Sequence, residues 1–231
     1  MLKSLLQAVA HIFSPRVCPI CESTLGESEE IMCTDCLLQM PRTHFHTSPF
    51  NIIHQRLGPA VKLDRAAAWF YYVKQTSYAQ LLIDTKYGGR PLLGRKLGEA
   101  YAREIEPSGF FDGIDALVPV PMHYSKRLLR GFNQTEEICR GISRVTGIPQ
   151  HKLLAAPVSH GTQSHHTAAE RMAALKGTFA ATAEASDYDS RHLLVVDDII
   201  TTGATMQEAL VNLRRACPSA TISVLALAAT M

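Results

Sequence analysis

Apolar runs and amphipathic stretches alternate along most of this chain of 231 residues. Short apolar runs bounded by turn residues are typical of buried strands, and apolar positions three or four residues apart are typical of helices. The alternation predicts an α/β fold in which helices cover a parallel sheet. The predicted strands span 66–73, 115–120, 153–158, 192–196 and 222–228, the predicted helices span 1–14, 77–87, 91–105, 133–145 and 205–216, and 159–177 is a long polar loop.

The most informative segment is 193–205, where a strand leads through a polar loop into a helix. Two carboxylates, Asp197 and Asp198, end the apolar run. The N-terminus of the following helix presents free backbone N–H groups and a partial positive charge to a phosphate, and Gly203 permits a positive φ. The carboxylates would repel phosphate, but they suit ribose hydroxyls or a site near Mg²⁺. The alternative is an ordinary turn with a polar loop; a Walker A loop is excluded because no Gly-Lys-Ser/Thr follows.

This segment resembles the thirteen-residue signature of type I phosphoribosyltransferases, which bind 5-phosphoribosyl 1-pyrophosphate (PRPP). The resemblance implies a type I phosphoribosyltransferase fold that binds PRPP together with Mg²⁺. It implies catalytic roles for Asp197 and Asp198. The implied ligand-binding residues of the loop are Ile199, Thr201, Thr202, Gly203, Ala204 and Thr205.

Basic residues follow the predicted strand 115–120, whose end carries two prolines. Lys126, Arg127 and Arg130 could bind a pyrophosphate there, since guanidinium and ammonium groups suit its charge. The alternative is a solvated basic helix start. Arg171 belongs to the long polar loop, which is a candidate lid. Lys86 is equally consistent with a functional role and with simple complementation of a helix dipole.

Four of the six cysteines form two CxxC pairs, Cys18/Cys21 and Cys33/Cys36, which are separated by eleven residues. Two such pairs are typical of a structural zinc site with four thiolate ligands. The alternatives are two disulfides or reduced cysteines without metal. His44 and His46 are substitute ligands only if a cysteine is not used.

The composition excludes some classes of function for this protein. Apolar residues make up 46% of the chain, which allows a substantial core, and the net charge of +2 excludes a whole-chain attraction to nucleic acid. No cleavage site follows the first helix, and no apolar run reaches the roughly 20 residues of a membrane span. We therefore expect a cytoplasmic protein without a membrane span.

Taken in order, the motifs resemble the ComF family of competence and DNA-uptake proteins. The resemblance rests on both CxxC pairs, 86–88, 118–121, 130–134, Gln163, Glu170, Arg171, Phe179 and 193–205. Ala174 departs from the family pattern, which usually has Asn there. The resemblance implies a role in handling incoming single-stranded DNA beside a helicase-like ATPase.

The expected organisation is a helix and zinc module over 1–40, a linker over 41–64 and a phosphoribosyltransferase-like domain over 65–231. Three functions stay open: a PRPP-binding protein of DNA uptake, an active salvage phosphoribosyltransferase, or a zinc-ribbon scaffold without catalysis. We also expect weak, salt-sensitive binding of single-stranded DNA at local basic residues. They are Lys86, Arg90, Arg95 and 126–130, whereas the aromatic residues of 69–72 are expected in the core rather than stacked on bases.

Overall fold

The computed structural model describes residues 16–87, 91–156 and 178–231. The predicted helix 1–14, residues 88–90 and the loop that holds Gln163, Glu170, Arg171 and Ala174 lie outside these ranges.

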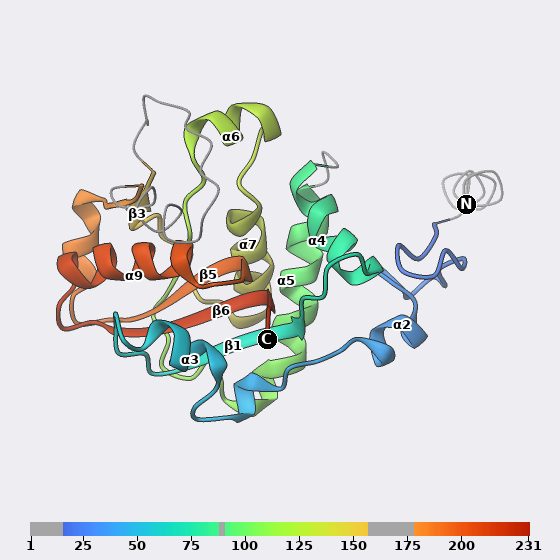
Figure 1. Cartoon of the computed structure of the whole chain (residues 1–231), viewed down its shortest axis with the longest axis horizontal. Coiled ribbons are helices and arrows are strands. Elements are labelled where there is room, and N and C mark those ends of the chain that lie inside the picture. Colours follow the sequence, from blue (N-terminus) through green and yellow to red (C-terminus); the bar gives the residue numbers. More distant parts are fainter. Residues whose placement is uncertain (1–15, 88–90, 157–177) are drawn as a thin grey trace.

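A four-stranded parallel sheet forms the centre of the fold, in the order β1-β6-β5-β2. Its strands are β1 (Ala66–Tyr71), β2 (Ala116–Pro119), β5 (His192–Ile200) and β6 (Thr221–Ala229). Helices lie on both sides of the sheet (Figure 1). The predicted α/β class with a parallel sheet flanked by helices is therefore confirmed.

The two faces of the sheet bury different helices because successive side chains of a strand point to opposite sides. In β5, Leu194 and Val196 belong to the cluster that contains α4 (Ser77–Tyr87), α5 (Pro91–Ile105) and α7 (Gln134–Thr146). Leu193 and Val195 belong to the cluster that contains α3 (Ile52–Leu57) and α9 (Ala204–Ala216). The core therefore has two layers with the sheet between them.

Helices α5 and α7 pack closely through glycines. A Cβ atom at Gly141 would collide with the carbonyl oxygen of Arg95, and one at Gly98 would collide with that of Ile138. The absence of a side chain at both positions lets the two backbones touch, which fixes α7 against the sheet.

The described part of the predicted strand 153–158, residues 153–156, differs from the prediction. Instead of joining the parallel sheet, β3 (Leu154–Ala155) pairs antiparallel with β4 (Ala180–Ala181) as a separate two-stranded unit. An apolar run fixes only that a segment is buried, and here Leu153 and Leu154 pack into the α9 layer. The remaining short elements are α6 (Tyr124–Arg130) and the 3₁₀ turns η1 (Phe45–Thr47), η2 (Glu106–Ser108) and η3 (Ala183–Tyr188).

The N-terminal cysteine module packs directly on the domain. Its helix α2 (Thr34–Gln39) carries Cys36, which shares one buried cluster with Trp69, Leu81 and Tyr101. Tyr78 donates a hydrogen bond of 2.7 Å to the Cys36 carbonyl. The buried side chains of the module therefore continue the core of the sheet.

Residues 41–64, expected to be an irregular linker, contain η1 and α3. Ile53 and Leu57 of α3 are fully buried against the sheet. The segment is therefore part of the domain's packing, although the domain boundaries themselves stay a prediction.

Candidate functional site

The polar loop after β5 has the geometry that the sequence predicts. Gly203 has φ +84° and is the N-cap of α9, so the positive φ expected there is present. A Cβ atom at Gly203 would lie 2.9 Å from Leu57 Cδ2 of α3. Arg56, the neighbour of Leu57, donates a hydrogen bond of 2.9 Å to the Thr201 carbonyl. Helix α3 thus contacts the loop through Arg56 and Leu57.

The acid pair lies within the strand rather than after it. Asp197 pairs with Ala226 of β6, and both carboxylates are buried, with Asp197 7% and Asp198 4% exposed. The Asp198 N–H donates a hydrogen bond of 2.8 Å to Asp197 Oδ1. Burial, together with the neighbouring charge of Asp198, raises the pKa of Asp197 well above its usual range.

Lys86, at the C-terminal end of α4, meets this pair. Its Nζ lies 2.6 Å from Asp198 Oδ2, with side-chain exposures of 23% and 5%. The contact is an ion pair rather than a well-aligned hydrogen bond, because among the described residues Asp198 Oδ2 has no hydrogen-bond donor of regular geometry. The two residues lie 112 positions apart in sequence, and only the fold brings them together.

A cavity of about 280 Å³ opens beside the acid pair, and we call it the acid-pair cavity. It lies at the carboxyl end of the parallel strands, where ligands of such sheets bind. Among the predicted site residues, those that line it are Asp197, Asp198, Ile199, Thr201, Thr205, Lys126 and Arg130, and Lys86 joins them. The cavity therefore combines two carboxylates, two loop hydroxyls and three cationic side chains.

Other predicted site residues lie elsewhere. Thr202, Gly203 and Ala204 form the loop and the start of α9 without lining the cavity. Arg127 points to Glu136, with 3.9 Å between Nη1 and Oε1, and lines a neighbouring cavity. Arg171 lies outside the described residues.

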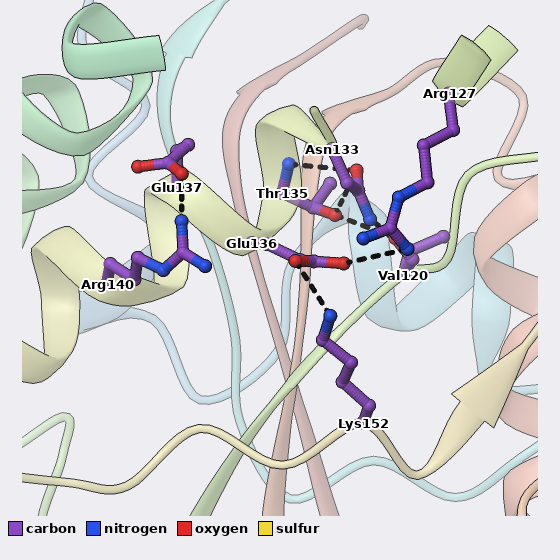
Figure 2. Close-up of polar contacts among 8 residues, drawn as sticks. All are labelled: Val120, Arg127, Asn133, Thr135, Glu136, Glu137, Arg140 and Lys152. Atoms are coloured by element: carbon purple, nitrogen blue, oxygen red, sulfur yellow. Dashed lines mark hydrogen bonds and ion pairs between the residues drawn. The ribbon is translucent and has the colours of Figure 1, made fainter. Parts of the chain in front are cut away.

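The start of α7 is fixed by the run 131–135. Asn133 is the N-cap, and its Oδ1 accepts a hydrogen bond of 3.2 Å from the Thr135 N–H. The Thr135 hydroxyl and the Asn133 amide both donate to the Val120 carbonyl, at 2.7 and 3.2 Å (Figure 2). These bonds anchor α7 to the segment that follows β2, with Asn133 as the cap of the helix.

The four cysteines of the CxxC pairs converge. Their sulfur atoms all lie within 4.8 Å of one another, so Cys18, Cys21, Cys33 and Cys36 could hold a metal such as zinc. All are free thiols, so the disulfide alternative is not formed. Hydrogen bonds from the Ser23 hydroxyl and backbone lower the pKa of Cys21 to about 6, which favours the thiolate that a metal requires.

The remaining predictions concern packing. The two cysteines outside the CxxC pairs, Cys139 and Cys217, are fully buried. Trp69 and Phe70 are also buried, so they belong to the core and are not available for stacking on bases. Lys86 is paired with Asp198 and Arg95 with Glu137, at 2.8 Å, which removes both from the expected basic surface. Within the described ranges, no helix is both long and apolar enough to cross a membrane.

Together, the parallel sheet, the glycine-containing loop and the acid pair at the carboxyl end of β5 form the α/β arrangement that the resemblance to type I phosphoribosyltransferases predicts, beside an N-terminal four-cysteine module. The chain's sequence is 32% identical over 102 residues to competence protein F of Haemophilus influenzae, and the match covers 44% of each protein. It is 26% identical over 200 residues to DNA utilization protein YhgH of Escherichia coli O157:H7, which covers 83% of this chain and 81% of the relative. The chain is thus similar in sequence to proteins named for competence and for DNA utilization.

The match to competence protein F spans less than half of that relative's length. No family model matches the chain. Among solved structures, the glutamine PRPP amidotransferase from B. subtilis complexed with ADP and GMP has a TM-score of 0.42 at 19% identity, covering 62% of this chain and 30% of the enzyme. The allosteric regulatory enzyme of purine biosynthesis has a TM-score of 0.37 at 20% identity, covering 57% and 25%.

Proposed function

We propose that the protein binds PRPP with Mg²⁺ in the acid-pair cavity. The observation that carries this proposal is the division of charge within one cavity. Asp197 and Asp198 line it next to Lys86, and the basic residues of α6, Lys126 and Arg130, line the same space. A ligand that suits both must offer hydroxyl donors to carboxylates and phosphate oxygens to cations, and PRPP does so.

Each part of PRPP has a partner in this arrangement. The ribose hydroxyls donate to the acid pair, and the 5-phosphate accepts from the backbone N–H groups and hydroxyls of 201–205 at the start of α9. The pyrophosphate lies toward Lys126 and Arg130, whose charges offset its own.

The acid pair also fits a Mg²⁺ ion that accompanies the ligand. Hard divalent cations take oxygen ligands, and they are commonly held by one or two carboxylates together with substrate phosphates. Asp198 Oδ2 pairs with the Lys86 ammonium and, among the described residues, accepts no hydrogen bond of regular geometry. A bound cation would supply charge to the pyrophosphate, and Asp198 would orient it.

Calorimetry with PRPP and Mg²⁺ tests the proposal. Asp198→Asn keeps the shape but removes the charge, so we expect its affinity to fall by about 1.5–3 kcal/mol. Asp187→Asn is the matched control, because Asp187 is an exposed residue of η3. A wild-type protein that ignores PRPP, or an Asp198→Asn variant that binds it as well as the control does, would refute the assignment.

We also propose that the four cysteines hold one structural zinc ion. The support is that the four sulfur atoms lie within 4.8 Å of one another and that the pKa of Cys21 is lowered. Metal analysis of the purified protein should find one zinc per chain, and protein without metal in which the cysteines are oxidised would contradict it.

The biological setting that fits best is use of incoming DNA in the cytoplasm. The names of the relatives, competence protein F and DNA utilization protein YhgH, support this setting. Single-stranded DNA and a helicase-like ATPase are the partners we propose. The surface for them is α6, where Leu128 and Leu129 are 68% and 79% exposed beside basic residues.

Fluorescence anisotropy of a labelled oligonucleotide across a salt series tests direct DNA binding. Each phosphate contact should add about 0.7 to the log–log salt slope. Binding that is unchanged when Lys126, Arg127 and Arg130 are all replaced by Ala would assign the DNA role to a partner.

A further inference from the structure

A second cavity lies next to the acid-pair cavity. Its volume is about 310 Å³, and we call it the Glu136 cavity after the carboxylate in its wall. The two cavities share Pro121, Met122 and Asn133, but neither Asp197 nor Asp198 lines this one. The space lies between α6, the first turn of α7 and the segment around β3.

Two cationic side chains converge on Glu136 from different parts of the chain. Glu136 is 8% exposed. Its Oε2 lies 2.9 Å from Lys152 Nζ, and its Oε1 lies 3.9 Å from Arg127 Nη1. Figure 2 shows Arg127 and Lys152 reaching the carboxylate from opposite sides. The fold therefore gathers two positive charges around one buried negative charge.

The cluster retains positive charge and hydrogen-bond donors. One carboxylate offsets one of the two cations, which leaves a net charge of +1. At 3.9 Å the guanidinium of Arg127 is too far for a hydrogen bond, so its N–H donors are not used by Glu136. Within the described part of the chain, neither Arg127 nor Lys152 has another side-chain partner. Both line the cavity, so these donors are available to an anion inside it.

The rest of the wall is largely apolar. Its other polar members are Asn133 and Thr182, and the remaining residues are Pro119, Pro121, Met122, Tyr124, Leu154, Ala155 and Ala156. The volume falls in the lower part of the range of small-molecule sites, and an apolar wall with a few placed polar groups is their usual composition. The cavity thus suits a compact ligand with an apolar body and one anionic group.

Glu137, the next residue of α7, provides an internal comparison. It also meets two cations, Arg95 at 2.8 Å and Arg140, but it does not line the Glu136 cavity (Figure 2). That cluster ties α7 to α5. A buried glutamate with two cations is therefore not by itself a site; the adjoining cavity distinguishes Glu136.

We propose that the Glu136 cavity binds a small aromatic or heteroaromatic carboxylate. The ligand's carboxylate lies between Arg127 and Lys152, and its ring lies against Met122 and Leu154. This binding does not require PRPP, because the residues that carry it are separate from the acid pair.

Ligand-observed NMR titration of the full chain without PRPP tests the proposal. Benzoate is the probe, benzamide is the neutral compound of the same shape, and inorganic phosphate is an anion without a ring. We expect benzoate to bind at least about tenfold more tightly than benzamide, since charge-assisted hydrogen bonds are lost with the charge. Arg127→Met and Lys152→Met should each weaken benzoate binding by about tenfold.

Two controls keep the test specific. Arg140→Met removes a cation of the neighbouring cluster and should leave benzoate binding unchanged. Asp198→Asn should also leave benzoate binding unchanged. Failure of the PRPP proposal is then distinguishable from failure of the benzoate-binding proposal. Because Arg127 and Lys152 are each 53% exposed, their variants should fold, and circular dichroism checks this.

Several results would overturn the proposal. These are absence of benzoate binding, equal affinity for benzamide, or an equal loss in the Arg140→Met variant. Phosphate that binds more tightly than benzoate and displaces it would show a compact-anion site instead of a site for a carboxylated ring.

Discussion

Replacing Lys86 by Met tests whether the Lys86 ammonium occupies the position beside Asp198 that a bound divalent cation would take. The ammonium lies 2.6 Å from a carboxylate that is only 5% exposed. Leaving a buried charged group without its partner costs about 1.5–3 kcal/mol, and the variant does this to the Asp198 carboxylate. For a chain of this size each kcal/mol shifts Tm by roughly 2–4 °C, so we expect Tm to fall by roughly 3–12 °C.

The affinity for a divalent cation should change in the opposite direction. In the wild type a cation must displace the Lys86 ammonium from Asp198, and in Lys86→Met it does not. The same 1.5–3 kcal/mol is then recovered on binding, which corresponds to about ten- to hundredfold tighter binding of Mn²⁺. Electron paramagnetic resonance of free Mn²⁺ measures this affinity without PRPP, and calorimetric unfolding measures Tm.

Lys96→Met is the matched control for this experiment. Lys96 pairs with Glu30 at 3.4 Å, but Glu30 is 63% exposed, and surface pairs contribute about 0–1 kcal/mol. We expect almost unchanged stability and Mn²⁺ affinity in this variant. If Lys86→Met loses stability while its Mn²⁺ affinity equals that of the wild type, Lys86 is purely structural and the reasoning is refuted.

Three further predictions concern the acid pair, the helix packing and the cysteine cluster. Burial raises the pKa of Asp197 in the folded state, so the folded chain binds this proton more tightly and loses stability as pH rises above about 3.9. The Asp197→Asn variant should therefore be more stable than the wild type at pH 8 but not near pH 4. Urea unfolding in which the variant is less stable than the wild type at pH 8 would contradict this. Gly141→Ala should cost about 1–3 kcal/mol because its Cβ meets the Arg95 carbonyl oxygen, whereas Gly94→Ala, with contacts no shorter than 3.5 Å, should not destabilise; equal denaturation midpoints would argue against close helix packing. Cys36→Ser should lose the metal and lower the Tm of the whole protein, because Cys36 shares a cluster with Trp69. His44→Asn should keep the metal. Metal analysis and calorimetry check both variants, and an unaltered main unfolding transition in Cys36→Ser would contradict the prediction.

Local patterns predicted the parts of the site that are close in sequence. The strand, the acid pair, Gly203 and the helix that follows it are encoded within a dozen residues, and the structure has all of them. The same holds for the two CxxC pairs, whose spacing predicted a four-cysteine cluster and whose sulfurs lie together in the structure.

Contacts between distant segments could not be predicted in this way. Lys86 reaches Asp198 only because α4 packs beside β5 in space, and a lysine at a helix end is common without such a partner. Arg56 and Leu57 support the Thr201–Gly203 turn from a segment whose prolines and glycine indicate a linker. Residues 153–158 show the same difficulty, because an apolar run indicates burial but not which partner strand it joins.

The most direct measurement of the central claim compares PRPP with its two fragments, ribose 5-phosphate and pyrophosphate, by calorimetry in the presence of Mg²⁺. Asp198→Asn should weaken PRPP and ribose 5-phosphate more than pyrophosphate. Lys126→Met should weaken PRPP and pyrophosphate while leaving ribose 5-phosphate unchanged. If both variants bind all three compounds like the wild type, or if the wild type binds none, the acid-pair cavity is not a PRPP site.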